Sequence, residues 1–359
     1  MSAYESRCFV TDYSALDRLL HRLALQVTPV AAMSFDLDQR RVKRDPQEIV
    51  QARHVFVSGL ARAGTTVLMR QFHASGAYRS LTYRDMPFVL APNLWRALSQ
   101  TSKRDAVAAE RAHGDGLLVD FDSPESLDEV FWHVFAGESY LHKTYLTPHE
   151  PDADLVRKYV CYVNAILSAQ AVPGSRYLSK NNNNLLRLGA IRQAFPQALI
   201  LIPFRQPLAQ AASLLRQHRN FLDLQAADRF ARAYMTWLAH HEFGRDHRPF
   251  RFDETQPRAD SLYDTDGLDY WLEGWCRAYD WLARCAPEDA VFVCYEDLCD
   301  GPSVPDRLAD LAGLPTLGGA GAFVAGAVSD EAARDSALAA RARDLYERLV
   351  ERARRPCAE

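Results

Sequence analysis

Hydrophobic residues occur along this chain in two patterns, short uninterrupted runs and longer segments of helical spacing. Three short runs, residues 54–57, 198–202 and 291–295, are rich in β-branched and aromatic residues and predict buried strands. Between them, apolar side chains recur every three or four residues, which predicts helices. Continuous apolar strands that alternate with helices are typical of a parallel sheet covered on both faces. The pattern therefore predicts an α/β fold built as a three-layer sandwich.

Helices are expected wherever apolar or aromatic side chains repeat at helical spacing. These segments are the first fifty residues, residues 65–73, the segment that starts at Ser123-Pro124-Glu125, residues 226–243, residues 268–284 and the Ala- and Arg-rich tail after Ser329. The aromatic residues of the two segments 226–243 and 268–284 are expected to pack in the core. Two polar segments, residues 38–48 and 244–267, predict a solvated linker and a long loop.

We expect one domain over residues 1–359. A helical lead-in, residues 1–50, precedes an α/β core, residues 51–316, which carries the polar insertion 244–267 and is followed by a helical extension, residues 317–359. A length of 359 residues would also suit two domains, but a single elaborated α/β domain reaches this size.

Composition and charge narrow the possible partners. Lys and Arg number 42 against 46 Asp and Glu, so the formal net charge is −4. This balance argues against a broad nucleic-acid or anionic-membrane surface, and a site for an anion must gather its positive charge locally. No segment approaches the roughly 18 apolar residues of a membrane span, and no apolar leader is present near Met1. The seven cysteines form no Cys-x-x-Cys pair, so we expect a reduced, cytoplasmic protein without a metal site.

A glycine-rich loop joins the first predicted strand to the next helix. Gly59 and Gly64 have the spacing of a Walker A loop, and the backbone near Gly64 and the first amides of the helix favour a bound anion. Thr65 stands where a Walker A loop has lysine, Arg62 is the cation of the loop, and Thr66 adds a second hydroxyl. Such a loop is poorly suited to the β- and γ-phosphates of Mg-ATP. It indicates a P-loop-like fold that binds a less charged 5′-phosphate with one further anionic group.

A second group of polar residues follows the second strand. Arg205 comes directly after that strand, Pro207 begins the next helix, and Ser213 lies eight residues after the arginine. An arginine at the carboxyl edge of a parallel sheet and a serine two turns into the next helix can converge on one phosphate, because ligands bind at that edge.

Together these segments resemble the sulfotransferases that use 3′-phosphoadenosine-5′-phosphosulfate (PAPS). The run Gly-Leu-Ala-Arg-Ala-Gly-Thr-Thr at residues 59–66 is similar to the family's 5′-phosphosulfate loop, in the form found in tyrosylprotein and many bacterial sulfotransferases. Phe204-Arg205 with Ser213 resembles the 3′-phosphate motif, and the segments at Lys180 and Tyr295 resemble two further motifs in family order. The resemblance does not extend to the C-terminus, and Gln217 stands where the family has an arginine.

The resemblance implies a PAPS-dependent sulfotransferase that acts on a hydroxyl acceptor and leaves 3′,5′-adenosine bisphosphate. We expect a carbohydrate or small-molecule acceptor rather than a tyrosyl peptide, and transfer without a metal. The residues implied for the donor site are Arg62, Ala63, Gly64, Thr65, Thr66, Lys180, Arg205, Ser213 and Tyr295.

Sulfuryl transfer also needs a general base for the acceptor hydroxyl, whereas Arg62 is expected to stabilise the transferred group. Asp85 is the first candidate base, because the tyrosylprotein enzymes carry their catalytic glutamate in the corresponding place. His113, in the sequence His-Gly-Asp-Gly, is the second candidate.

Two other functions remain open from the sequence. A P-loop kinase or NTPase would share the glycine loop, but Thr65 in place of the Walker lysine and the pair of Arg205 and Ser213 argue against it. A non-catalytic nucleotide-binding scaffold would keep the fold and the donor site while Asp85 and His113 do nothing.

Overall fold

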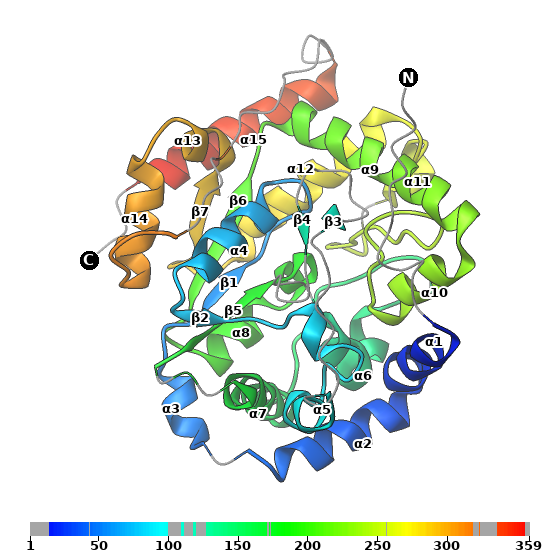
Figure 1. Ribbon diagram of the computed structural model, residues 1–359. Helices are drawn as coiled ribbons and strands as arrows, with labels where there is room; N and C mark the ends of the chain where they lie inside the picture. Colours follow the sequence, from blue (N-terminus) through cyan, green and yellow to red (C-terminus); the bar gives the residue numbers. More distant parts are fainter. Residues whose placement is uncertain are drawn as a thin grey trace.

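A five-stranded parallel sheet lies at the centre of the molecule, with helices on both faces (Figure 1). Its strands follow the order β2-β5-β1-β6-β7, and every neighbouring pair is parallel. The bounds are β1 Val55–Val57, β2 Tyr78–Arg79, β5 Arg176–Lys180, β6 Leu199–Phe204 and β7 Val291–Cys294. A separate antiparallel pair joins β3 (Ala109–Glu110) to β4 (Leu118–Val119). The predicted α/β sandwich is confirmed, and all five carboxyl ends of the central strands meet at one edge.

The computed structural model describes most of the chain. It covers residues 14–42, 44–99, 109–110, 118–119, 127–170, 172, 174–255, 257–318, 323 and 336–355. The predicted helix start at Ser123-Pro124-Glu125 lies outside these residues. Within them, no helix combines the length and the apolarity that a membrane crossing requires.

The three predicted strands are confirmed as β1, β6 and β7. The last of them ends one residue earlier than expected, because Tyr295 begins the short helix α13. Strand β5 was not predicted: its sequence Arg-Tyr-Leu-Ser-Lys lacks a continuous apolar run. Ser179 is nevertheless buried in this strand, since its hydroxyl donates a hydrogen bond to Asp128 Oδ2 over 2.6 Å.

Helices surround the sheet and extend the chain at both ends. In chain order they are α1 Ala15–His21, η1 Arg22–Gln26, α2 Thr28–Gln39, α3 Pro46–Val50, α4 Thr65–Ala74, η2 Tyr83–Asp85, α5 Pro92–Ser99, α6 Glu129–Tyr140, α7 Ala153–Ala169, η3 Asn182–Leu186, α8 Leu188–Ala194, α9 Pro207–Ala227, α10 Arg229–Trp237, α11 Ala259–Leu262, α12 Leu268–Cys285, α13 Tyr295–Cys299, α14 Ser303–Ala312 and α15 Ala337–Arg354. The helices predicted at 65–73 and 268–284 are confirmed, and those of the lead-in and the tail are confirmed over the described residues 15–39, 46–50 and 337–354.

Two sequence-based boundaries are wrong. The helix expected over residues 226–243 ends at Trp237, because Ala239 takes a φ of +57° that a helix cannot continue. The linker expected over residues 38–48 is shorter, because α3 begins at Pro46 behind the capping side chain of Asp45. The predicted loop 244–267 is confirmed apart from the short helix α11.

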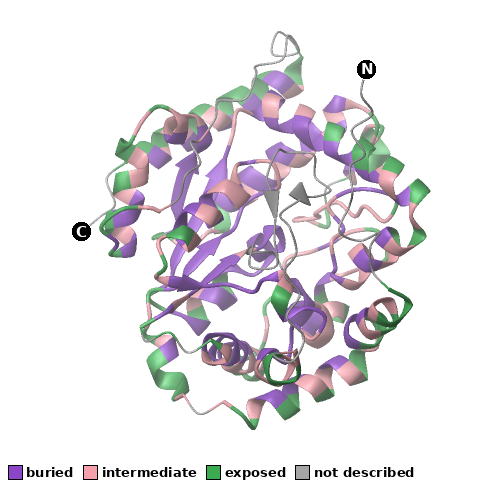
Figure 2. Ribbon diagram, viewed as in Figure 1, coloured by how far each residue is buried: buried purple, intermediate pink, exposed green. Residues whose placement is uncertain are grey.

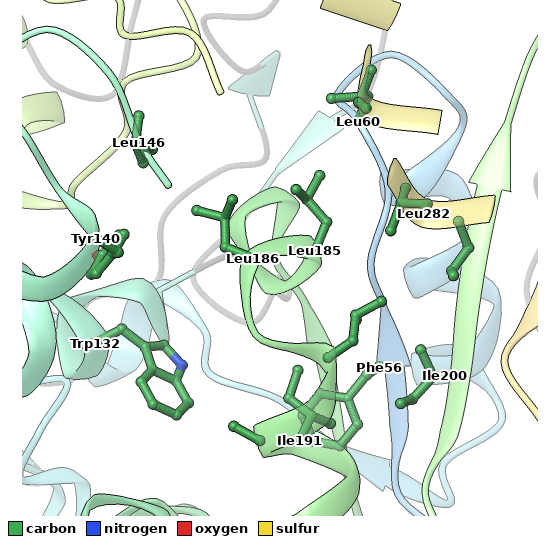
Figure 3. Close-up of a cluster of buried hydrophobic side chains, with 14 of the residues drawn as sticks. Phe56, Leu60, Trp132, Tyr140, Leu146, Leu185, Leu186, Ile191, Ile200 and Leu282 are labelled. Atoms are coloured by element: carbon green, nitrogen blue, oxygen red, sulfur yellow. The ribbon is translucent and has the colours of Figure 1, made fainter. Parts of the chain in front are cut away.

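The sheet separates two hydrophobic cores, because successive side chains of a strand point to opposite faces. Val55 and Val57 of β1 face the smaller core, which includes apolar residues of α4 and α14. Phe56 faces the larger core with Ile200 of β6 and Ile191 of α8 (Figure 3). The central strands are accordingly buried apart from Arg176 and Lys180 at the two ends of β5, whereas the outer helices expose part of their surface (Figure 2).

Candidate functional site

The loop between β1 and α4 brings Arg62 to Ser213 at the carboxyl edge of the sheet. Arg62 Nε donates a hydrogen bond to Ser213 Oγ over 3.1 Å. Ser213 is buried in α9, which begins just after the carboxyl end of β6. The backbone of Arg62 has a φ of +68°, a conformation that is costly for a residue other than glycine and that marks functional loops. The fold thus joins the two segments that the sequence singled out for phosphate binding.

Gly64 is required by both its backbone and its surroundings. It is the N-cap of α4 with a φ of +81°, and a Cβ at this position would lie 2.3 Å from Cδ2 of Tyr295. The guanidinium of Arg205 lies 5.4 Å from the centroid of the same tyrosine ring, at cation–π distance. Tyr295 therefore connects the loop to Arg205, and three predicted donor-site residues are brought together.

Gln210 is a central hydrogen-bonding residue that the sequence did not indicate. Its Nε2 donates to the carbonyl of Ala61 over 2.9 Å. Its Oε1 accepts from the backbone N–H of Arg205 over 3.2 Å and from Trp275 Nε1 over 3.0 Å. The residue is fully buried, so these bonds fix the loop relative to the end of β6. A glutamine inside a helix carries no sequence signal for such a role.

Glu296 also lies beside Arg205 and was not predicted. Its Oε1 accepts from the backbone N–H of Gln206 over 3.0 Å and lies 4.0 Å from Arg205 Nε. The carboxylate therefore orients the arginine at the sheet edge. In the sequence, only the motif at the neighbouring Tyr295 could have indicated Glu296.

Lys180 is the last residue of β5 and pairs with Val57 at the base of the loop. The asparagines that follow it bind buried carboxylates. Asn181 Nδ2 donates to Asp128 Oδ1 over 3.2 Å and to Glu129 Oε2 over 2.7 Å. These hydrogen bonds hold the backbone that follows β5 and fix the direction in which the chain leaves Lys180.

Arg187 completes this buried network. It donates two hydrogen bonds to Glu129, from Nη1 to Oε2 over 2.7 Å and from Nη2 to Oε1 over 3.1 Å. Burial by itself would raise the pKa of Glu129, but Arg187 outweighs burial and holds that pKa below its usual value. Burial raises the pKa of the neighbouring Asp128. An ionised Glu129 and a more weakly acidic Asp128 therefore lie side by side near the end of β5.

Asp85, the first candidate base, lies in a buried cap. Arg79 Nη2 donates to both of its oxygens over 2.7 and 2.9 Å, and the Thr82 N–H donates to Oδ2 over 2.8 Å. These contacts tie β2 to η2 and favour a structural role, because both carboxylate oxygens are already occupied. The assignment of Asp85 as base stays a prediction. His113, the second candidate, lies outside the described residues.

A cavity of about 70 Å³ adjoins the loop. Leu60 and Ala61 of the loop form part of its wall, and the insertion 244–267 contributes His247, Phe250 and other residues. Over the part of the chain that the structure describes, no group of three or more His, Cys, Asp or Glu side chains is placed to hold a metal ion.

Comparisons with known proteins show what the chain is similar to. The family model described as "Sulfotransferase family" matches residues 54–252, more than half of the chain. Among solved structures, sulfotransferase STF1 from Mycobacterium tuberculosis is 15% identical with a TM-score of 0.44, over 95% of this chain and 87% of that chain. A sulfotransferase from Alicyclobacillus acidocaldarius is also 15% identical, with a TM-score of 0.40 over 84% of this chain and 97% of that chain. No curated protein sequence matches the chain.

Proposed function

The chain belongs to the sulfotransferase family, and on this premise we propose that it transfers a sulfuryl group from PAPS to an acceptor hydroxyl. The observation that carries the proposal is the hydrogen bond between Arg62 and Ser213. It joins the loop that we propose for the 5′-phosphosulfate to Ser213, which we propose for the 3′-phosphate, and the donor carries an anionic group at both positions. The acceptor is a small molecule or a carbohydrate rather than a tyrosyl peptide.

The proposed donor site uses both ends of this contact. The backbone from Ala63 to Thr66, at the N-terminus of α4, and the side chain of Arg62 bind the 5′-phosphosulfate. Arg205 and Ser213 bind the 3′-phosphate, and the Tyr295 ring lies by the adenosine. Gly64 keeps the loop close to that ring.

The reaction is an in-line displacement at sulfur. The acceptor oxygen forms a bond to sulfur while the bond from sulfur to the bridging oxygen breaks, and the electron pair of that bond leaves with the 5′-phosphate. The acceptor proton passes to a base on the enzyme. Arg62 and Lys180 stabilise the negative charge that grows on the leaving phosphate. These cations fill the role for which phosphoryl transfer uses a metal, so we propose a metal-independent reaction.

Thermal shift with purified protein tests the donor. Stabilisation by 3′,5′-adenosine bisphosphate in EDTA, with none from Mg-ATP, supports the proposal; the reverse supports a kinase or NTPase. Arg62→Ala and Arg205→Ala should each remove most of the shift. Arg284→Ala is the matched control, because Arg284 is an exposed arginine paired with Asp280 near the end of α12.

Radiolabelled PAPS then separates an enzyme from a scaffold. Transfer of label to any hydroxyl compound in a broad acceptor panel identifies a sulfotransferase. Bisphosphate binding without label transfer to any acceptor favours the non-catalytic nucleotide-binding scaffold.

A further inference from the structure

The cavity beside the donor loop is lined in part by residues that adjoin the proposed donor site in the chain. Leu60, Ala61 and Leu214 line it, and they are neighbours of Arg62 and Ser213 in the chain. Other lining residues come from the segments 241–243 and 247–250 and from α12. A group held in this cavity therefore lies next to the loop that we propose to bind the phosphosulfate.

Glu242 is the one carboxylate among the described residues that line this cavity. Its Oε1 accepts a hydrogen bond from Asn182 Nδ2 over 3.1 Å, and its Oε2 lies 3.6 Å from His240 Nδ1. Its side chain is 16% exposed. One carboxylate oxygen is hydrogen-bonded to Asn182 and the other is paired with His240, while the side chain lines the cavity and stays partly exposed.

The charge state of Glu242 follows from its neighbours. Burial by itself would raise the pKa of this carboxyl, but His240 and Lys180 outweigh burial and hold the pKa below its usual value. Glu242 is therefore ionised at neutral pH. Asn182, which donates to Glu242, follows Lys180 by two residues, so the carboxylate lies near the end of β5.

The other titratable groups of the cavity are less suited to accept a proton. The ring nitrogens of His241 and His247 already contact the Asp246 carbonyl and the Tyr270 hydroxyl. Arg248 donates to the carbonyl of His142 and Arg277 pairs with Glu273. Glu242 is the remaining group that combines negative charge with access.

The walls and the size of the cavity indicate what enters it. Phe243, Phe250 and Trp271 contribute aromatic surface, and the Trp271 ring is already packed against His218 and His247 at centroid distances of 5.1 and 4.9 Å. A volume of about 70 Å³ corresponds to roughly two water molecules of about 30 Å³ each. A sugar ring would bring several hydroxyls against these aromatic walls, which costs free energy.

We propose that this cavity receives the hydroxyl-bearing end of a compact apolar alcohol or phenol, and that Glu242 is the general base for that hydroxyl. The inference rests on the proposed function. As the acceptor oxygen bonds to sulfur, its proton passes to the Glu242 carboxylate, and the displaced phosphate keeps the electron pair of the broken bond. The proton returns to solvent after the sulfated product leaves.

Gly274 of α12 gives a test of the cavity. It lines the cavity, and a Cβ at this position would meet no atom within 4 Å. Gly274→Leu should fill the cavity and lower kcat/KM for phenol and cyclohexanol at least tenfold, with an unchanged affinity for 3′,5′-adenosine bisphosphate. Gly189→Leu is the matched control, since Gly189 is an exposed helical glycine of α8 whose added Cβ also meets nothing. Equal kcat/KM in the two variants would overturn the cavity assignment.

Glu242→Gln tests the base. We expect kcat with cyclohexanol to fall by about 10²- to 10⁴-fold, the usual contribution of general base catalysis, while bisphosphate affinity stays within about twofold. The loss should be much smaller with 4-nitrophenol, which ionises near neutral pH without help, and Glu242→Asp should recover part of it. Asp85→Asn is assayed in the same way, because Asp85 is the other candidate base, and its thermal stability is measured in parallel. A Glu242→Gln variant with full kcat, or with equal losses on both acceptors, contradicts the assignment.

The same assays separate the two proposals. Wild-type protein that binds no bisphosphate and transfers no label refutes the proposed function. Wild-type protein that binds bisphosphate but sulfates only maltose, or none of phenol, cyclohexanol and maltose, refutes the acceptor cavity and leaves the donor site standing.

Discussion

Arg62 and Ser213 are 151 positions apart in the sequence, yet the Nε of Arg62 donates a hydrogen bond to the Oγ of Ser213 over 3.1 Å. The contact closes the β1–α4 loop against α9. It restrains the arginine side chain at the carboxyl edge of the sheet. Less side-chain freedom is then lost when an anion binds, so the entropy cost of binding is smaller.

Ser213→Ala should weaken the binding of 3′,5′-adenosine bisphosphate. A hydrogen bond to a charged group contributes about 1.5–3 kcal/mol, so we expect the Kd to rise by about ten- to a hundredfold. Isothermal titration calorimetry measures the change. Ser303→Ala is the control, because Ser303 is an exposed serine at the start of α14; an equal Kd for both variants would contradict the role of Ser213.

Gly64→Ala should destabilise the fold more than the same change at Gly76. Both glycines have positive φ values, +81° and +73°, and alanine is strained at either one. A Cβ at Gly64 also meets the Tyr295 ring at 2.3 Å, whereas at Gly76 it meets nothing. We expect Gly64→Ala to cost about 1–3 kcal/mol more in urea unfolding than Gly76→Ala. Tyr295→Ala should recover part of that difference, and equal losses at both glycines would show that the ring is not in the way.

Gln210→Leu should affect both the fold and the donor site. The change removes the partners of the Ala61 carbonyl, the Arg205 N–H and the Trp275 N–H. Each buried group left without a partner costs about 1–3 kcal/mol, so the unfolding free energy should fall by several kcal/mol and bisphosphate affinity should fall with it. Trp275→Phe removes only one of these bonds and should leave the affinity for the nucleotide closer to that of the wild type.

The fold should lose stability in mild acid, and His54 should contribute to this loss. His54 is fully buried, its Nδ1 accepts from the Tyr177 N–H over 2.8 Å, and its Nε2 contacts the Ile49 carbonyl at 2.9 Å. Burial lowers its pKa from 6.5 to about 4. Between pH 6.5 and 4, His54 is protonated in the unfolded chain but stays neutral in the folded protein. The unfolding free energy therefore falls as the pH drops from 6.5 to 4.

Urea unfolding of wild type and His54→Gln at intervals from pH 7.5 to 4.5 measures this effect. The variant is destabilised at pH 7.5, because it loses a buried contact, but its stability should decline less steeply below pH 6.5. The difference between the two proteins should therefore narrow with acidification. Parallel curves would show that His54 takes up its proton equally in the folded and unfolded states.

The buried carboxylates of Asp128 and Glu129 show why part of the site cannot be predicted from the sequence. The asparagines after Lys180 have no repeating pattern that points to Asp128 or Glu129, since these partners lie about fifty residues earlier in the chain. Strand β5 was missed because its polar side chains interrupt the apolar run by which a buried strand is recognised.

The sequence by itself determined the sheet type, three of its strands, and the loop with Arg62 and Gly64. These features are local: strand, turn and helix preferences act over a few neighbouring residues, and the anion-binding geometry of a helix N-terminus needs only a contiguous segment. Only the tertiary structure decided that Gln210 fixes the loop, that Asp85 is held by Arg79, and that Glu242 and Gly274 border one cavity. Those relationships depend on packing between elements far apart in the chain, where burial sets the charge state and the access of each group.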